Sequence, residues 1–143
     1  MTADLTARSP GSPGKRLRVL VADDHKGMLE NLVRMLSSDF DVVAAVGDGG
    51  AVIAQAERVR PDLLILDVTM PVMNGIAAAA RLKATGSTAK VVFVTMLHDR
   101  EFVQQSSSLG AVGFVVKDQL VADLMPAIYS VLAGRPFVSS SVS

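Results

Sequence analysis

Five short apolar runs alternate with segments of helical periodicity, and this alternation constrains the fold more than any other feature. The runs occupy residues 17–22, 40–46, 63–67, 90–95 and 112–116. Runs this short and this continuously apolar are typical of strands buried on both faces, as in a parallel sheet. Strict alternation of strand and helix therefore predicts an α/β fold, with right-handed crossovers and helices on both faces of the sheet.

Each apolar run is followed by a segment with helical spacing or propensity. These segments occupy residues 28–36, 52–59, 76–83, 100–109 and 121–132. Pro126 lies inside the last one, where a proline removes a backbone donor and crowds the preceding turn. The sequence leaves open whether this helix starts late or bends at Pro126. Residues 47–50, Gly-Asp-Gly-Gly, fit a turn and helix start better than a phosphate-binding loop of P-loop or dinucleotide type.

Composition limits the chain to one domain. Its 143 residues carry 14 basic and 14 acidic side chains and no cysteine, which excludes disulfides and thiolate metal sites. We predict that residues 1–16 are a flexible tail, that residues 17–134 form the folded domain and that residues 135–143 begin a linker. The basic cluster Lys15, Arg16 and Arg18 is read as a solubilising feature. Because no apolar run approaches the roughly 20 residues of a membrane span and no secretory signal is present, we expect a cytoplasmic protein.

Polar side chains interrupt the apolar runs mainly at their ends. Asp23 and Asp24 follow the first run, Asp67 ends the third, Thr95 ends the fourth and Lys117 follows the fifth. The carboxyl ends of parallel strands lie at one edge of a sheet, where open α/β sheets bind ligands. We therefore expect three carboxylates, a hydroxyl and an ammonium to converge there.

This combination of groups suits phosphoryl chemistry. Carboxylates in close proximity raise at least one pKa unless cations compensate. Lys117 and a divalent ion are the candidate cations, and oxygen ligands without cysteine favour Mg²⁺, Mn²⁺ or Ca²⁺ over zinc. A carboxylate that attacks phosphorus forms an aspartyl phosphate. Positioning and charge neutralisation are the main requirements of such transfer.

Simpler interpretations exist for each residue taken alone. Asp23-Asp24 would also suit a helix N-cap, Thr95 an ordinary strand position and Lys117 a solvated strand end. Their joint occurrence at four strand ends favours a site. His25 and His98 lie too far apart in sequence for a recognisable metal pair and are predicted to be loop residues, and the methionines are expected to pack.

Four motifs resemble the receiver domain of bacterial two-component response regulators, over residues 17–134. They are Asp23-Asp24, Leu-Asp-Val-Thr-Met-Pro at 66–71 with Asn74-Gly75, Val-Thr-Met at 94–96, and Gly-Phe-Val-Val-Lys-Asp at 113–118. The resemblance implies a flavodoxin-like (βα)5 doubly wound parallel sheet with strand order 2-1-3-4-5.

The resemblance also implies a role for each acidic residue. Asp67 would be the phosphoacceptor. Asp24, Asp67 and the backbone carbonyl of Thr69 would hold Mg²⁺, or Mn²⁺ in its place, and Asp23 would act on the metal through a water. Thr69 departs from the asparagine often found there, which leaves the lifetime of the phosphoryl group open, whereas Asn74 in place of an aspartate still suits a turn before glycine.

The remaining implied roles concern the response to phosphorylation. Lys117 and Thr95 would each bind a phosphoryl oxygen, and Phe114 occupies the switch position, where a ring turns inward when Thr95 moves. Because Phe114 lacks a hydroxyl, its equilibrium should rest on packing alone. Asp118 follows Lys117 where a proline could stand, so a cis X-Pro bond is excluded there.

Within that family, residues 113–118 and 133–139 look most like the subfamily with a C-terminal LuxR-type helix-turn-helix. This implies phosphorylation by a sensor histidine kinase and a transcriptional output through a DNA-binding domain beyond this chain. One alternative is a stand-alone receiver that binds a protein partner without DNA. Another is a phosphatase with an aspartyl intermediate, which is disfavoured because Asp67-Val68-Thr69 lacks a second aspartate, so no enzyme is expected. The sequence leaves open whether the chain forms a homodimer, through the first and fifth helices or through the fourth-helix side. No membrane partner is expected.

Overall fold

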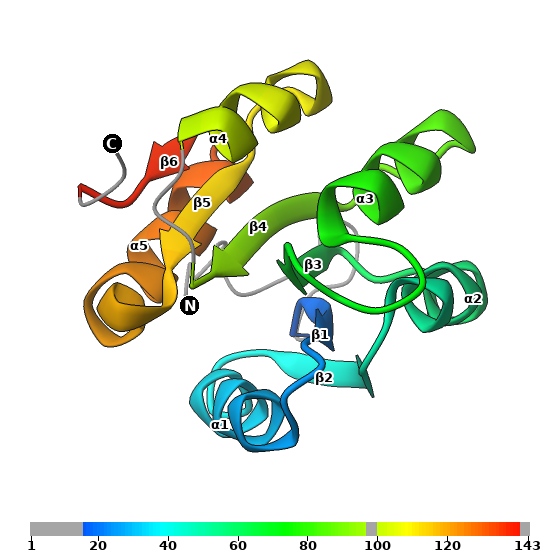
Figure 1. Cartoon of the computed structure of the whole chain (residues 1–143). Coiled ribbons are helices and arrows are strands. Elements are labelled where there is room, and N and C mark those ends of the chain that lie inside the picture. The colour runs from blue at the N-terminus through cyan, green and yellow to red at the C-terminus, as the bar shows by residue number, and fades with distance from the viewer. Residues whose placement is uncertain (1–15, 97–99, 141–143) are drawn as a thin grey trace.

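The computed structural model describes residues 16–96 and 100–140, which form a parallel sheet with helices on both faces (Figure 1). The sheet has the order β2-β1-β3-β4-β5-β6, so the predicted order 2-1-3-4-5 is confirmed and a sixth strand is added. Residues 1–15 of the predicted tail 1–16, the predicted loop position of His98 and residues 141–143 lie outside the described residues.

The first five strands coincide closely with the five apolar runs. They are β1 (Arg18–Ala22), β2 (Asp41–Val46), β3 (Leu63–Asp67), β4 (Lys90–Thr95) and β5 (Gly113–Val116). All five residues of β3 are buried, because this strand lies between β1 and β4 and is covered on both faces. A central strand has no solvated face, which explains why its sequence shows no alternation of polar residues.

The helices divide between the two faces of the sheet. They are α1 (Lys26–Leu36), α2 (Gly49–Val59), α3 (Gly75–Ala84), α4 (Arg100–Ser106) and α5 (Leu120–Leu132), with short 3-10 turns η2 (Ser107–Leu109) and η3 (Lys117–Gln119). Helices α1 and α5 pack on the face that carries Leu63 and Ile65. Helices α2, α3 and α4 pack on the face that carries Leu64 and Leu66. Successive residues of β3 thus supply two separate cores.

The last helix and the segment after it answer the question that the sequence left open. Helix α5 begins at Leu120 and continues through Pro126, so the helix does not start after the proline. Residues 137 and 138, expected at the start of a linker, instead form β6 (Phe137–Val138), which pairs in parallel with β5. A strand of two residues has no measurable periodicity, which is why the sequence did not predict it.

No helix in the described part of the chain is both long and apolar enough to cross a membrane.

Candidate functional site

The polar strand ends meet at one edge of the sheet, as the topology requires. Asp67 is the last residue of β3 and Thr95 the last residue of β4, while Asp23 and Lys117 directly follow β1 and β5. Asp23, Asp67 and Thr95 are buried, with 1%, 4% and 1% of their surfaces exposed. Buried polar groups are costly unless they are paired, so their presence at one place indicates a built site.

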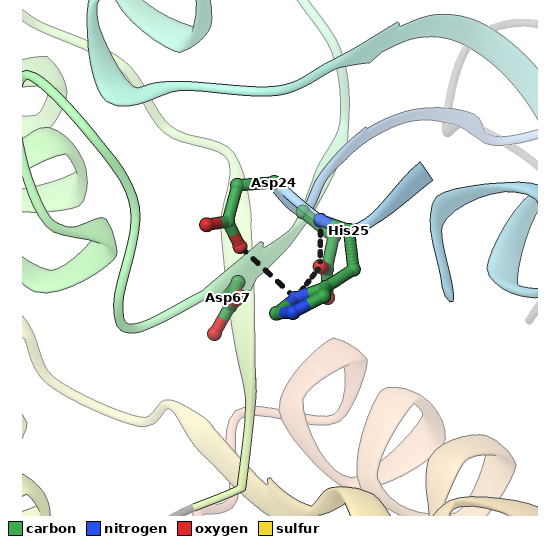
Figure 2. Close-up of side chains that lie close together, drawn as sticks. Asp24, His25 and Asp67 are labelled. Carbon is green, nitrogen blue, oxygen red and sulfur yellow. Dashed lines mark hydrogen bonds and ion pairs between the residues drawn. The ribbon is translucent and has the colours of Figure 1, made fainter. Parts of the chain in front are cut away.

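Three carboxylates and one imidazole surround a common space at this edge. Each of Asp23, Asp24, His25 and Asp67 offers one ligand atom, and these atoms all lie within 4.8 Å of one another. Figure 2 shows the side chains of Asp24, His25 and Asp67 gathered beside the end of β3. Asp23 and Asp67 are buried whereas Asp24 is exposed, so the cluster has an inner wall and a side open to solvent.

Lys117 lies on the buried side of this cluster, between Asp23 and Asp67. Its Nζ lies 2.7 Å from Asp23 Oδ2 and 3.3 Å from Asp67 Oδ2, and only 5% of its side chain is exposed. Lys117 begins η3 immediately after β5, so the end of that strand fixes where its side chain starts. Two buried carboxylates therefore share one ammonium, and the inner part of the site keeps an excess negative charge.

The pKa values of Asp67 and Lys117 reflect both their burial and the charges beside them. Burial, and then the neighbouring charge of Asp23, raise the pKa of Asp67 from 3.8 to about 6, against the opposing effects of Lys117 and of the Thr69 amide. Burial alone would lower the pKa of Lys117, but its contacts with Asp23 and Asp67 outweigh burial and raise that pKa above its ordinary value. Burial is thus the main cause of the raised pKa of Asp67, whereas the raised pKa of Lys117 comes from its two carboxylate neighbours.

The loop between β3 and α3 holds Asp67 from the other side. The Thr69 amide donates to Asp67 Oδ1 at 3.2 Å. Asn74 is the N-cap of α3, and its side chain accepts from the Ala77 amide at 2.7 Å. A Cβ on Gly75 would lie 2.1 Å from the Asp67 carbonyl oxygen, so only glycine permits this close approach. The Asn-Gly pair thus anchors the loop beside the Asp67 carboxylate.

Val72, in the same loop, has a φ of 74° and an exposed fraction of 82%. The left-handed region is unfavourable for a β-branched residue. The loop therefore holds local backbone strain five residues after Asp67.

Phe114 and Thr95, the two residues assigned to the switch, lie on neighbouring strands. Phe114 is 1% exposed, and its ring packs against Phe93 with centroids 5.9 Å apart and an interplanar angle of 50°. Thr95 pairs in register with Val116, the residue before Lys117. The ring of Phe114 is thus inside the core formed with α2, α3 and α4.

Sequence reasoning missed His25. It lies in the bend before α1, so its prediction as a loop residue holds, but it is also the N-cap of that helix and its imidazole belongs to the acidic cluster. Its amide donates to Asp23 Oδ1 at 2.9 Å, and its Nδ1 lies 3.3 Å from Asp24 Oδ1. Neither aspartate is the cap residue of α1, so the simpler reading of Asp23-Asp24 as a helix cap is wrong. Direct adjacency to the Asp-Asp pair was the available signal.

The donor set fits a hard divalent cation. Three carboxylates lie around one space, and carboxylate and carbonyl oxygens are the ligands that Mg²⁺ prefers. The charge of Asp23, which after burial is the second cause of the raised pKa of Asp67, is one that a divalent cation would neutralise.

Comparison with known families matches residues 19–129 to the response regulator receiver domain. The chain belongs to this family. Receiver domains are not a family of catalytic enzymes, in agreement with the expectation that the chain is not an enzyme.

Individual relatives agree with this assignment. Transcriptional regulatory protein PdtaR from Mycobacterium tuberculosis is 37% identical over 112 residues, which cover 78% of this receiver and 54% of PdtaR. The receiver thus spans about half the length of that relative. The crystal structure of a LuxR-family two-component response regulator from an Aurantimonas species is 29% identical with a TM-score of 0.82, covering 88% of this chain and 91% of that chain. The CheX–CheY–BeF3–Mg²⁺ complex from Borrelia burgdorferi is 25% identical with a TM-score of 0.77, covering 83% of this chain and 91% of that chain.

Proposed function

We propose that this receiver accepts a phosphoryl group from a sensor histidine kinase on Asp67 and changes shape in response. The observation that carries the proposal is the buried carboxylate of Asp67, held 3.3 Å from Lys117 Nζ at the edge of the acidic cluster. A carboxylate oxygen of Asp67 attacks phosphorus, the bond from phosphorus to the kinase imidazole nitrogen breaks, and the imidazole leaves with the electron pair.

The residues around Asp67 divide the work of positioning the metal. Asp24, Asp67 and the backbone carbonyl of Thr69 would hold Mg²⁺, or Mn²⁺, and Asp23 would contact it through a water. When bound, the cation supplies charge neutralisation to the carboxylates and the phosphoryl oxygens. The structure of the CheX–CheY complex with BeF3 and Mg²⁺ supports this proposal by family likeness.

Lys117 and Thr95 are assigned to the phosphoryl oxygens. Phosphorylation adds nearly two negative charges and three acceptor oxygens at Asp67, and Lys117 already contacts that carboxylate. Thr95 lies at the end of the next strand. Movement of Thr95 toward the phosphoryl group changes the space beside Phe114, whose packing on Phe93 then selects between two arrangements.

For the output, we propose control of transcription through a DNA-binding domain outside this chain. The relatives named as a transcriptional regulatory protein and as a LuxR-family response regulator support this proposal. A stand-alone receiver that regulates a protein partner is the alternative. The coding sequence after Ser143 separates the two, because a helix-turn-helix domain supports the first and a stop codon the second.

A homodimer through α1 and α5, or through the α4 side, stays a prediction that light scattering with and without a phosphoryl mimic tests.

The direct experiment incubates the protein with acetyl phosphate and Mg²⁺ and measures its intact mass. Wild type should gain the mass of one phosphoryl group, and Asp67→Asn should gain none. Glu57→Gln, an exposed change on α2, is the matched control and should behave as wild type. No modification of wild type, or equal modification of Asp67→Asn, refutes the proposal.

A further inference from the structure

Ser139 is a buried hydroxyl in the terminal segment beyond the residues that match the family. The match ends at residue 129, and Ser139 is 2% exposed. Its Oγ accepts from the Val116 amide at 3.1 Å and donates to Asp123 Oδ2 at 2.7 Å. Ser139 therefore joins the end of β5 to the first turn of α5.

The backbone of the same segment is fixed along β5. The Phe137 amide donates to the Val112 carbonyl at 3.2 Å, and the Ser139 amide donates to the Phe114 carbonyl at 2.9 Å. The Val116 amide is the next donor along that strand, and the Ser139 hydroxyl accepts it where the backbone of β6 has ended. Without this hydroxyl, a buried amide and a carboxylate would both lose a partner, which is costly in a protein interior.

These contacts fix two residues of β5, the strand that leads to Lys117. Ser139 bonds the backbone of Phe114 through its amide and the backbone of Val116 through its hydroxyl. Val116 directly precedes Lys117, whose Nζ lies 3.3 Å from Asp67 Oδ2. The position of Lys117 relative to Asp67 thus depends on a strand end that the terminal segment holds.

We propose that Ser139 is a positioning residue for Lys117, and that residues 137–139 form a latch that couples occupancy of Asp67 to the chain that follows. The inference rests on the proposed role of Asp67 and Lys117 in phosphoryl binding. Coupling of this kind is reciprocal. If the latch favours the arrangement that binds a phosphoryl group, then occupancy of Asp67 tightens the latch by the same factor.

The test compares Ser139→Ala with Ser139→Thr, which keeps a hydroxyl, and with Ser140→Ala, the same chemical change at the exposed neighbouring position. Calorimetric titration measures the affinity of each folded variant for Mg²⁺ alone and for fluoroberyllate in saturating Mg²⁺. Because Lys117 contacts the phosphoryl mimic and is not a metal ligand, Ser139→Ala should weaken fluoroberyllate binding about three- to tenfold. Its Mg²⁺ affinity should stay within about twofold of wild type, and Ser139→Thr should restore fluoroberyllate binding.

Hydrogen exchange supplies the reciprocal measurement. Fluoroberyllate should slow exchange of the Phe137, Ser139 and Val116 amides in wild type. Equal fluoroberyllate affinity in Ser139→Ala and Ser140→Ala overturns the latch while leaving the proposed function intact. Parallel loss of Mg²⁺ and fluoroberyllate affinity also overturns it, because general loosening of the site would then be the cause. Failure of folded wild type to bind fluoroberyllate with Mg²⁺ refutes the proposed function itself.

Discussion

Replacing Asp67 by asparagine should stabilise the metal-free protein at neutral pH. The substitution removes the charge of a carboxylate that is 4% exposed and lies beside Asp23 and Lys117. Asparagine has nearly the same shape, so the packing at the end of β3 is kept. Lys117 also keeps its closer partner, Asp23, at 2.7 Å.

The magnitude follows from the raised pKa of Asp67, about 6 against an ordinary 3.8. Because the native carboxyl binds its proton more readily than the unfolded one, the native state is favoured at low pH. The contribution of Asp67 to the unfolding free energy therefore falls as pH rises from about 4 to about 6 and then stays low. At about 1.4 kcal/mol for each pH unit, the ionised carboxylate costs the native state about 3 kcal/mol. Because the asparagine amide cannot fully replace a protonated carboxyl next to Lys117, we expect a gain of about 2 to 3 kcal/mol.

Urea unfolding in EDTA, followed by far-UV circular dichroism, measures this gain. Asp67→Asn should exceed wild type by the stated amount above about pH 7, and the difference should nearly vanish below about pH 4. Saturating Mg²⁺ should stabilise wild type and shrink the difference, since ligand binding to the native state adds stability. Glu57→Gln should show neither effect. An Asp67→Asn protein that is no more stable than wild type above about pH 7 in EDTA, or a difference that persists below about pH 4, refutes the reasoning.

Three further substitutions test the geometry around Asp67. Val72→Asn should stabilise the protein by about 1 kcal/mol, because asparagine tolerates the left-handed backbone at that exposed position; an unchanged urea midpoint would contradict the strain. Gly75→Ala should destabilise it by about 3 kcal/mol and weaken fluoroberyllate binding, since the new Cβ meets the Asp67 carbonyl oxygen; a fully stable variant would show that the loop yields easily. His25→Ala should weaken Co²⁺ binding about tenfold relative to Mg²⁺, because Nδ1 lies 3.3 Å from Asp24 Oδ1; an unchanged ratio of the two affinities by calorimetry would remove His25 from the metal's surroundings.

The sequence predicted the sheet and the polar cluster at its edge because both follow from the pattern of apolar and polar residues along the chain. A central parallel strand must be apolar throughout, so residues 63–66 indicated β3 and the carboxylate of Asp67 marked its end. The meeting of Asp67 with Lys117 followed from topology alone, since both lie at carboxyl ends of parallel strands.

Other structural features leave no periodic pattern of apolar residues in the sequence, so they could not be predicted from it. Strand β6 is two residues long and is defined by its pairing with β5. The place of His25 depends on a side-chain direction at the start of α1, and the φ of Val72 on how the loop after β3 closes. A proline is unfavourable inside a helix, yet the packed helix α5 continues through Pro126.

The short strand β6 also determines which parts of the surface stay available for assembly. An unpaired strand edge is a template for β-addition by another chain, and such edges drive aggregation. Residues 137–139 of the same chain occupy this edge of β5. Phe137 and Val138 pair with it as strand β6, and the Ser139 hydroxyl accepts the next hydrogen bond, from the Val116 amide. A truncated receiver ending at Gly134 should therefore expose the edge of β5 and be prone to self-association through it.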